Sequence, residues 1–559
     1  MTHMNGQDTI RIGTGPWLRL LAALAALLLL TAACSSSDTT AEDAEVDDTD
    51  AVAEATADVE DEEAPTGDDA TEDAAETDDS GDSADDEELV IGMGFSPRSL
   101  WANSSTAQQE VNISEQITEK LIEFGPNAEF EPRLASSWEQ VDDTTLELVL
   151  EEGVTFTNGE AFNAESAVYS LEVMLNSAAY GTFTSAIASA EAVDEYTVRI
   201  TTASPTGLHM AALAVGSFQY PMAHFEEVGE EAFGTAPIGT GPYILDELVL
   251  GEEVRLVANQ DYWNGAPDIE RVIFRTIPEP SSQLAALETG EIGLLLDMPL
   301  DAADRIESSP DLQVIGRPGS RMYSLTMSAI SDSPMAEPAV RAAIKYALDV
   351  EAIIAGPLQG RGVQLQDQML TEAYFGFDPA REAVEYDPDR AIELLAEAGY
   401  PDGFDAVFKY PSGRYVKDAE VSQVIAAQLA EVGINVTQEV LEPGTFLDQL
   451  SNLELNDMYF GGTLPPADAH YVYFQYECEW RYAYYCRDDI DELLVEGTST
   501  ADAEERMAIY DEMRAIFDED PPAVPLYVTE DLYGATAALS GFTPWASQFV
   551  DVRSFVLDS

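Results

Sequence analysis

Three segments in the second half of the chain carry apolar residues at a spacing of three and four, which is the repeat of one face of an α-helix. They begin at Pro338, at Asp387 and near Val421. In the second segment, Asp387 and Pro388 supply a cap and a first-turn proline, and Gly399 supplies the stop. The apolar faces are, in order, Val340, Ala343, Ile344, Ala347 and Leu348; Ile392, Leu395 and Ala396; and Val421, Val424, Ile425, Leu429 and Val432. These faces predict core packing and no chemistry.

Short apolar runs predict β-strands between such helices. Residues 89–93 read LVIGM and predict an opening buried strand, and residues 434–436 predict another after the third helix. Asn158 and Gly159 suit a tight turn after a strand that ends at Phe156. This mixture of strands and amphipathic helices predicts α/β lobes. A chain of 559 residues is too long for one core, so we expect two or three lobes.

The first 34 residues have the layout of an export signal. Arg11 and Arg19 precede the apolar run 20–30, which is short for a membrane span. The run ends in Thr31, Ala32, Ala33 and Cys34, which resembles a bacterial lipobox. The resemblance implies a lipoprotein signal peptide over residues 1–33 and a lipid on Cys34, whose two acyl chains suffice for stable attachment. We therefore expect an extracytoplasmic protein anchored to the outer face of the cell membrane; a cleaved soluble protein and an uncleaved anchor are the alternatives.

Residues 34–88 are predicted to be an acidic disordered tether. From residue 35 on, this segment holds 25 Asp and Glu and no Lys or Arg, and it has almost nothing large enough to form a core. Such a self-repelling chain is extended. Calcium binding is an alternative, but these carboxylates lack the fixed loop with a turn glycine that calcium loops use.

The overall charge narrows the classes of partner. The chain has 106 acidic and 25 basic residues and a net charge of -81, with 45% hydrophobic residues. The apolar content excludes general disorder, and the charge excludes nucleic acid as a partner because phosphates would be repelled. Only four basic residues are Lys. This acidic, Arg-rich composition suits a high-salt habitat, where screening relaxes self-repulsion; an Ala-rich and Arg-rich genome with an acidic drift is the alternative.

The chain shows no motif of metal or covalent chemistry. With Cys34 assigned to lipid, Cys478 and Cys486 remain as a pair, and we expect a disulfide between them outside the reducing cytoplasm. The four His are scattered and no CxxC pair exists, so we expect no metal and no cofactor. No GxSxG elbow and no HExxH is present, which argues against an enzyme. A glycosidase is the alternative, because it needs only two carboxylates among the 106 acids.

Five local sequences, in a fixed order, carry a resemblance to a known family. They are "PRLASSWEQVDDTTLELVLEEGVTFTNGEAFNAESA" at 132–167, "PIGTGPY" at 237–243 with the following "NQDYWNGAPDIERVIFRTIPEPSSQLAALETGEI", "AVRAAIKYALD" at 339–349, "YDPDRAIELLAEAGY" at 386–400 and "AAQLAEVGINV" at 426–436. Taken together, they make the folded region resemble the ABC transporter extracellular solute-binding proteins of family 5, the peptide/nickel/oligosaccharide-binding class. Each motif alone is weak, and their order makes the resemblance specific.

The resemblance implies an α/β, two-lobed periplasmic-binding-protein-like fold of type II with an extra subdomain. The ligand would lie in the interlobe cleft and be buried by hinge closure. The implied solute-binding domain is 89–559. Its divisions are lobe one at 89–130, 237–318 and 530–559, the extra subdomain at 131–236, and lobe two at 319–529.

The resemblance also implies a function. The chain would be a monomeric solute receptor of an ABC importer that binds peptides or a similar small solute and delivers it to permease and ATPase subunits. An oligosaccharide-binding receptor of the same class is one alternative, and a ligand-sensing protein without transport is another. Nickel is a weaker alternative, because His470 alone supports it.

Candidate ligand contacts follow from the same resemblance. Peptide-binding members carry an Asp in lobe two that pairs with the ligand's amino terminus, and the corresponding stretch here, 461–470, has its acid displaced to Asp468. Arg414 is a candidate for holding a carboxylate. Trp480 lies in an aromatic segment, 471–485, that suits stacking on sugars or apolar side chains. The alternative is that half or more of its rings pack the lobe and its disulfide loop. The full set is Phe95, Trp101, Tyr323, Tyr410, Arg414, Asp468, His470 and Trp480.

Overall fold

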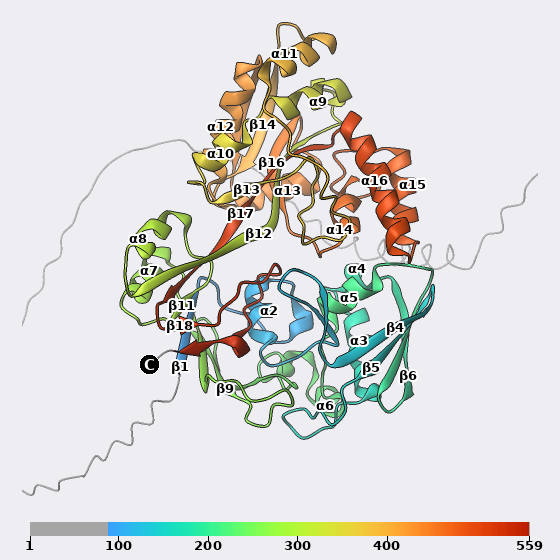
Figure 1. Ribbon diagram of the computed structural model, residues 1–559, viewed down its shortest axis with the longest axis vertical. Helices are drawn as coiled ribbons and strands as arrows, with labels where there is room; N and C mark the ends of the chain where they lie inside the picture. The colour runs from blue at the N-terminus through green and yellow to red at the C-terminus, as the bar shows by residue number, and fades with distance from the viewer. Residues whose placement is uncertain (1–87, 558–559) are drawn as a thin grey trace, which may run out of the picture. The chain divides into compact units, whose positions relative to one another are not determined.

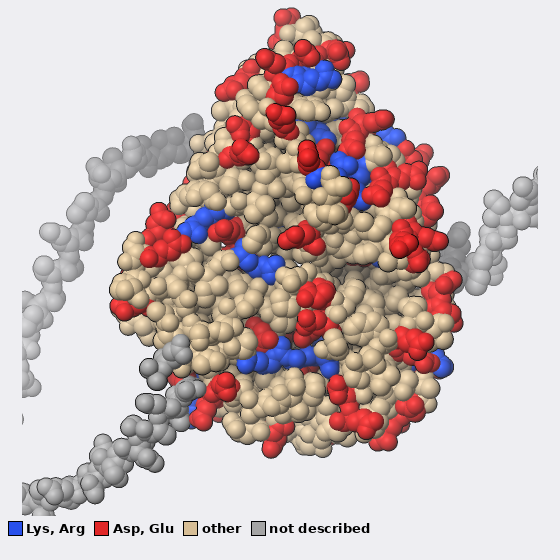
Figure 2. Space-filling view, viewed as in Figure 1, with Lys and Arg blue, Asp and Glu red and all other residues tan. Residues whose placement is uncertain are grey.

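A computed structural model describes residues 88–557. The predicted signal peptide, the predicted lipid attachment at Cys34 and the predicted tether lie outside the described residues. Among the residues that are described, no helix combines the length and the apolar character that a membrane span requires. Figure 2 shows acidic side chains spread over the face in view, with fewer basic ones between them.

One mixed sheet of 11 strands runs through the described chain (Figure 1). Its central strands, β12 and β17, are also its longest, at 16 and 14 residues. In spatial order the sheet contains β15 (Ile434–Leu441), β14 (Phe404–Pro411), β16 (Met458–Thr463), β12 (Leu312–Met327), β17 (Ala523–Thr536), β11 (Leu294–Leu295), β1 (Glu88–Met93), β10 (Arg271–Thr276), β9 (Glu253–Ala258) and β8 (Tyr243–Val249), with β13 (Gly362–Gln364) paired to β17.

The chain passes between the two halves of this sheet along β12 and β17. The two strands pair antiparallel from Leu312 opposite Thr536 to Thr326 opposite Ala523, and their register shifts between Pro318 and Met322. A break in register bends a strand locally. We therefore propose this segment as the hinge, with the lobes divided near residues 318 and 530 as the sequence predicts.

Separate hydrophobic cores lie on the two sides of the proposed hinge. Leu89, Ile91, Val272 and Phe274 belong to a fully buried core of lobe one, and Val340, Ile344, Ile425 and Phe408 belong to one of lobe two. The helices around the lobe-two cores are α9 (Pro338–Tyr346), α10 (Val350–Ala355), α11 (Pro388–Glu397), α12 (Asp418–Glu431), α13 (Pro443–Ser451), α14 (Ala469–Tyr473), α15 (Asp488–Thr498) and α16 (Ala503–Glu519). Those of lobe one are α2 (Gln108–Ser114), α7 (Pro280–Glu288) and α8 (Ala303–Glu307).

A four-stranded antiparallel sheet forms the extra subdomain. Its order is β4 (Ala135–Asp142), β5 (Thr145–Leu150), β7 (Thr197–Thr202) and β6 (Ile187–Asp194). The segment also contains α3 (Ala164–Leu175), α4 (Gly181–Thr184), α5 (His209–Gly216) and α6 (Met222–Phe233). Phe156 and Phe162 are buried in its core, and Trp138 packs against that core. A short hairpin of β2 (Ile122–Phe124) and β3 (Phe130–Pro132) precedes it. The structure therefore confirms the α/β fold class.

The predicted helices form, but the buried face of one of them differs from the predicted face. Pro338 begins α9, and Asp387 caps α11 through a hydrogen bond from the Arg390 amide. In α11, however, the buried residues are Ala391 and Leu395, whereas Ile392 is 42% exposed. Ala396 is exposed as well. The apolar face was therefore predicted wrongly at Ile392 and Ala396, because α11 packs on α9 through the neighbouring row of its surface.

Candidate ligand-binding cleft

A cavity of about 520 Å³ lies between lobe one with its extra subdomain and lobe two. A volume of this size suits a small-molecule ligand. The lobe-one side is lined by Thr106, Ala107, Gln108, Gln109, Val111, Glu115, Lys120, Glu123, Phe124, Ala128, Tyr180, Phe183, Ala214, Val215, Trp545, Ala546, Ser547, Gln548 and Phe549. The lobe-two side is lined by Ser320, Arg321, Ala373, Tyr374, Leu464, Pro465, Pro466 and Ala467.

The charged groups of the lobe-one wall are already paired within the protein. Lys120 forms an ion pair with Glu115, and its ammonium lies 4.9 Å from the centre of the Phe218 ring. Glu123 lies 3.7 Å from Arg133. Burial raises the pKa of Glu115 above its ordinary value, while Lys120 opposes that shift. A ligand therefore meets charges on this wall that are already balanced by ion pairs within the protein.

The lobe-two wall is held by hydrogen bonds that cross between loops and strands. Tyr374 donates its hydroxyl to the Pro465 carbonyl at 3.0 Å. Ser320 donates its hydroxyl to the Ala546 carbonyl of lobe one at 2.7 Å. The loop that contains Pro465 and the strand that contains Ser320 are thus fixed against the same cavity.

Aromatic rings supply much of the remaining surface. Trp545 and Phe549 pack edge to face with their ring centres 5.0 Å apart. Phe183 lies on the subdomain side and meets Tyr471 of lobe two edge to face at 5.7 Å. Large rings with a few polar groups between them are typical of sites that take a partly apolar small molecule.

None of the eight predicted contact residues lies among the residues that line this cavity. Asp468 has its carboxylate bound by the guanidinium of Arg506, at 2.8 and 2.9 Å, and also caps α14 through the amide of His470. It is 4% exposed. A carboxylate in this position is not available to the amino terminus of a ligand, so the expected displacement of the charge-pairing acid to Asp468 is not supported.

Three other candidates are located within or upon lobe two. Tyr323 is 3% exposed and stacks between Phe460 and Tyr527, and burial raises its pKa to about 12. Tyr410 is buried in the same core. Arg414 is exposed and lies over the ring of Tyr415. Contact of these three with a ligand stays a prediction that the cavity does not support.

Of the remaining four candidates, one is exposed and three pack against other aromatic rings. Phe95 is 40% exposed after β1. Trp101 packs against Phe225 of the subdomain. His470 and Trp480 both pack on the ring of Phe474. Burial lowers the pKa of His470 to about 4, which keeps its ring neutral.

The predicted disulfide is confirmed. Cys478 and Cys486 are bonded and close a short loop outside the cavity. The aromatic segment around it divides as expected: Tyr471, Tyr473, Tyr476, Tyr484 and Tyr485 are buried, whereas Trp480 and Tyr482 are only partly buried.

The sequence did single out one stretch that reaches the cavity. Residues 461–470 contain the lining residues Leu464 to Ala467, directly before the buried Asp468. The other lining residues were missed, namely those within 106–128, Tyr180, Phe183, Ala214, Val215, Ser320, Arg321, Ala373, Tyr374 and residues 545–549. The strongest signal for them was Arg321 beside two small residues in "RPGSRMY", which places a cation in a strand between lobes.

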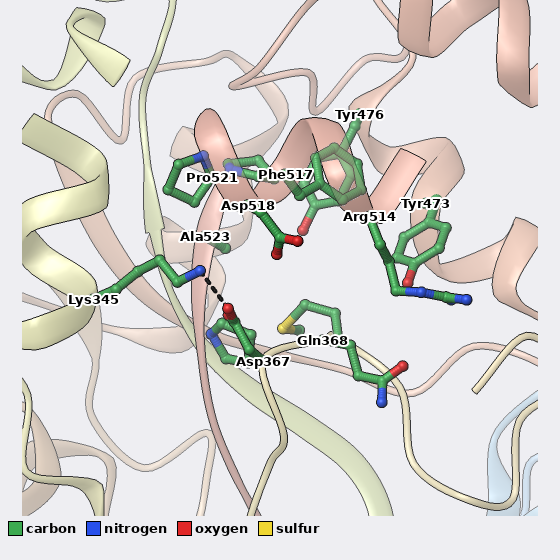
Figure 3. Close-up of a pocket in the computed structure, with 13 residues that line it drawn as sticks. Lys345, Asp367, Gln368, Tyr473, Tyr476, Arg514, Phe517, Asp518, Pro521 and Ala523 are labelled. Atoms are coloured by element: carbon green, nitrogen blue, oxygen red, sulfur yellow. Dashed lines mark hydrogen bonds and ion pairs between the residues drawn. The ribbon is translucent and has the colours of Figure 1, made fainter. Parts of the chain in front are cut away.

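A second cavity lies inside lobe two and has a volume of about 30 Å³. Lys345 and Asp367 line it and form an ion pair at 2.6 Å, which Figure 3 marks with a dashed line. This volume holds about one water molecule, so it is too small for a solute. In residues 88–557, no cluster of three His, Cys, Asp or Glu side chains has the arrangement of a metal site.

The comparisons with known proteins agree with this architecture. The family model of the bacterial extracellular solute-binding proteins, family 5 Middle, matches residues 129–480. Heme-binding protein A of Haemophilus influenzae is 25% identical over 469 residues, which cover 78% of this chain and 85% of that protein. Glutathione-binding protein GsiB of Escherichia coli K12 is 25% identical over 478 residues, covering 82% of this chain and 92% of that protein.

A solved structure extends the likeness to three dimensions. The ABC transporter-associated periplasmic binding protein DppA from Helicobacter pylori, in complex with the peptide STSA, superposes with a TM-score of 0.68 at 26% identity. The match covers 84% of this chain and 98% of that one. The two-lobed fold is therefore shown by structure as well as by sequence.

Proposed function

Because this chain belongs to the bacterial extracellular solute-binding proteins of family 5, we propose that it captures peptides or a similar small solute between its lobes and delivers it to a membrane permease. It is a substrate-binding receptor of an ABC importer. Binding and lobe closure would be its whole task, without covalent chemistry and without a cofactor.

One observation carries this proposal. The cavity of about 520 Å³ takes its lining from both sides of the proposed hinge. Lobe one contributes Gln108, Gln109, Val111 and Trp545 to Phe549, and lobe two contributes Arg321 and Leu464 to Ala467. A ligand that touches both walls binds the closed arrangement better than the open one and so shifts the population toward closure. A permease can then distinguish the loaded receptor from the empty one.

Peptides are the first choice of solute. Relatives are named for heme and glutathione, and a structural neighbour holds the peptide STSA. Peptide backbones and side chains suit a cavity whose walls mix glutamine, serine and aromatic residues. An oligosaccharide is the second candidate, and the specific support for it is the set of rings at Phe124, Phe183, Trp545 and Phe549, which suits stacking on sugars.

We also propose that the chain works outside the cytoplasm on a lipid anchor at Cys34. The support is the export-signal layout of residues 1–33 and the lipobox-like end of that segment. The acidic residues 35–88 would hold the receptor away from the membrane. A ligand-sensing protein would use the same cavity, and uptake of labelled solute by cells that carry or lack the gene separates transport from sensing.

The direct test is ligand binding followed by a measure of closure. A thermal-shift screen of the purified chain against di- to hexapeptides and oligosaccharides should find solutes that raise the melting temperature, because a ligand that binds the native state stabilises it. Small-angle X-ray scattering should then show a smaller radius of gyration with the bound solute. Turnover of any of these solutes, or the absence of every shift, would contradict the proposal.

A further inference from the structure

Arg321 is a cation at the cavity wall, and no carboxylate of residues 88–557 forms an ion pair with it. It lines the cavity from β12, and among the described residues its guanidinium takes part in no hydrogen bond or ion pair. A guanidinium has five N–H donors in a planar fork that matches a carboxylate. An open donor set of this kind in a ligand cavity is a specific feature, because the other cavity charges are compensated.

The backbone aims this side chain at the cavity. The pairing of β12 with β17 is interrupted between Pro318 and Met322, so Arg321 lies in an irregular segment of an otherwise long strand. Such irregularities often re-aim a side chain next to a functional site. Ser320, the residue before it, is held by hydrogen bonds to the Ala546 carbonyl and from the Tyr374 hydroxyl. The hydroxyl and the carbonyl of Ser320 therefore hold the backbone directly before Arg321.

The stem of Arg321 also has a shaped support. A Cβ at Gly462 on β16 would lie 3.4 Å from the Arg321 Cδ and 2.8 Å from the Tyr323 ring. The missing side chain at Gly462 thus leaves room for the arginine stem and for the buried ring beneath it. A residue larger than glycine would displace one of them.

The acids near the cavity form no ion pair with Arg321 within the described residues. Glu115 is paired with Lys120, and Glu123 lies close to Arg133. Asp531 on β17 has its Oδ1 bound by the amide of Gln548 at 2.9 Å, and it makes no ion pair within the part of the chain that the structure describes. Glu115 and Glu123 are therefore engaged with other cations. The charge of Arg321 opposes the rise in the pKa of the Asp531 carboxyl that burial causes, but no ion pair joins these two side chains in the described part of the chain.

We propose that Arg321 binds an anionic group of the solute, and that the solute presents no free ammonium to the cavity wall. The solute class is a carboxylate-bearing molecule with a neutral or blocked amino end and a partly apolar body. The carboxylate pairs with Arg321. The body lies against the rings of Trp545, Phe549 and Phe183. No unpaired acid among the cavity-lining residues is left to hold an ammonium, since Glu115 and Glu123 are engaged and Asp468 is bound to Arg506.

This inference rests on the proposed function and narrows its solute. It is tested on the full chain, purified in detergent, with two sets of probes. The first is the tripeptide Ala-Phe-Ala in four forms, with the amino end free or acetylated and the carboxyl end free or amidated. The second is a neutral oligosaccharide and the same oligosaccharide oxidised to a terminal acid. Affinity is measured by calorimetry at a fixed salt concentration.

We expect probes with a free carboxylate to bind about tenfold more tightly or better than their amides, because the amide loses a charge-assisted hydrogen bond. Acetylation of the amino end should not lower the affinity. Arg321→Met, which keeps the apolar stem over Gly462, should abolish the preference, and Arg321→Lys should retain part of it. Arg390→Met is the matched control, because Arg390 is exposed on α11 and, within the described residues, forms an ion pair with Glu393 alone, across one turn.

The outcomes separate this inference from the function on which it rests. Binding that is equal for carboxylate and amide, or that requires the free amine, overturns the role of Arg321 while leaving a solute receptor. The comparison of free with blocked amino and carboxyl ends uses the parent protein. It therefore tests the proposal even if a variant of Arg321 fails to fold. If no form of either probe set binds, the result contradicts the proposed function, and the inference about Arg321 fails with it.

Discussion

Tyr471 donates its hydroxyl to the carbonyl oxygen of Phe183 at 3.0 Å, across 288 residues of sequence. The two rings meet edge to face, and Tyr471 shares a small buried cluster with Leu208 and Ala211 of the subdomain. Tyr471 belongs to α14 of lobe two, whereas Phe183 belongs to α4 of the subdomain and lines the cavity. The contact therefore joins the two sides of the cavity away from the strands of the hinge.

Tyr471→Phe should weaken ligand binding while leaving the fold intact. The change removes the hydrogen bond but keeps the ring, and a hydrogen bond of this kind contributes about 0.5–1.5 kcal/mol, or roughly two- to tenfold in the population of the closed state. Calorimetry with any solute found by the screen measures the loss. Tyr473→Phe is the control, since the Tyr473 ring packs on Tyr510 and Phe517 within lobe two. An equal effect of both variants would contradict a closing role for Tyr471.

Asp468→Asn should destabilise the protein without changing the affinity of the folded fraction for peptides. The buried pair with Arg506 would lose its negative charge, and breaking such a pair by removing one partner costs about 3–5 kcal/mol. Urea unfolding measures the loss, and the added change Arg506→Met should recover part of it. A loss of affinity for peptides with a free amino end, at unchanged stability, would instead restore Asp468 as a ligand residue.

Removal of the disulfide should lower stability without opening the cavity. Cys478 and Cys486 are 8 positions apart. A loop of this length gives roughly 2–3 kcal/mol through the entropy of the unfolded chain. The double change Cys478→Ala and Cys486→Ala should therefore lower the free energy of unfolding by that amount, and a reducing agent should reproduce the loss in the parent protein. Unchanged stability in both experiments would show that the loop is held by its aromatic contacts alone.

Stability should rise, not fall, as the pH drops from neutral toward about pH 5. Burial raises the pKa of the Asp551 carboxyl from 3.8 to about 7, and it also raises the pKa of Glu115, Glu119 and Glu123 nearby. Between the two values for Asp551, the folded protein holds a proton that the unfolded chain has released. Raising the pH through this window therefore favours unfolding.

The contribution of Asp551 to this pH dependence can be isolated by Asp551→Asn. Urea unfolding at several values between about pH 5 and about pH 7.5 should show a smaller slope for this variant than for the parent protein. Asp389→Asn on the exposed first turn of α11 removes one charge elsewhere and controls for the general repulsion among acids. Parallel slopes for parent and Asp551→Asn would exclude a proton held by Asp551.

The sequence by itself determined the local elements and the class of fold. Asp387 and Pro388 start α11, Pro338 starts α9, and the run at 89–93 is a buried strand, because caps, helical spacing and short apolar runs act over a few residues. The pairing of Cys478 with Cys486 was also accessible from sequence, since they are the two cysteines that remain when Cys34 is taken as the predicted lipid site.

Only the tertiary structure decided which side chains face the solute cavity. Ile392 and Leu395 fit one helical face equally well, and the packing of α11 on α9 chose which is buried. Tyr323 and Arg321 are two residues apart, yet one is stacked in the core and the other lines the cavity, because β12 loses its register there. Likewise, Leu464 lines the cavity, whereas Asp468, four positions later, is buried in an ion pair with Arg506. A cleft between lobes is built from segments hundreds of residues apart, and no local pattern encodes their final orientation.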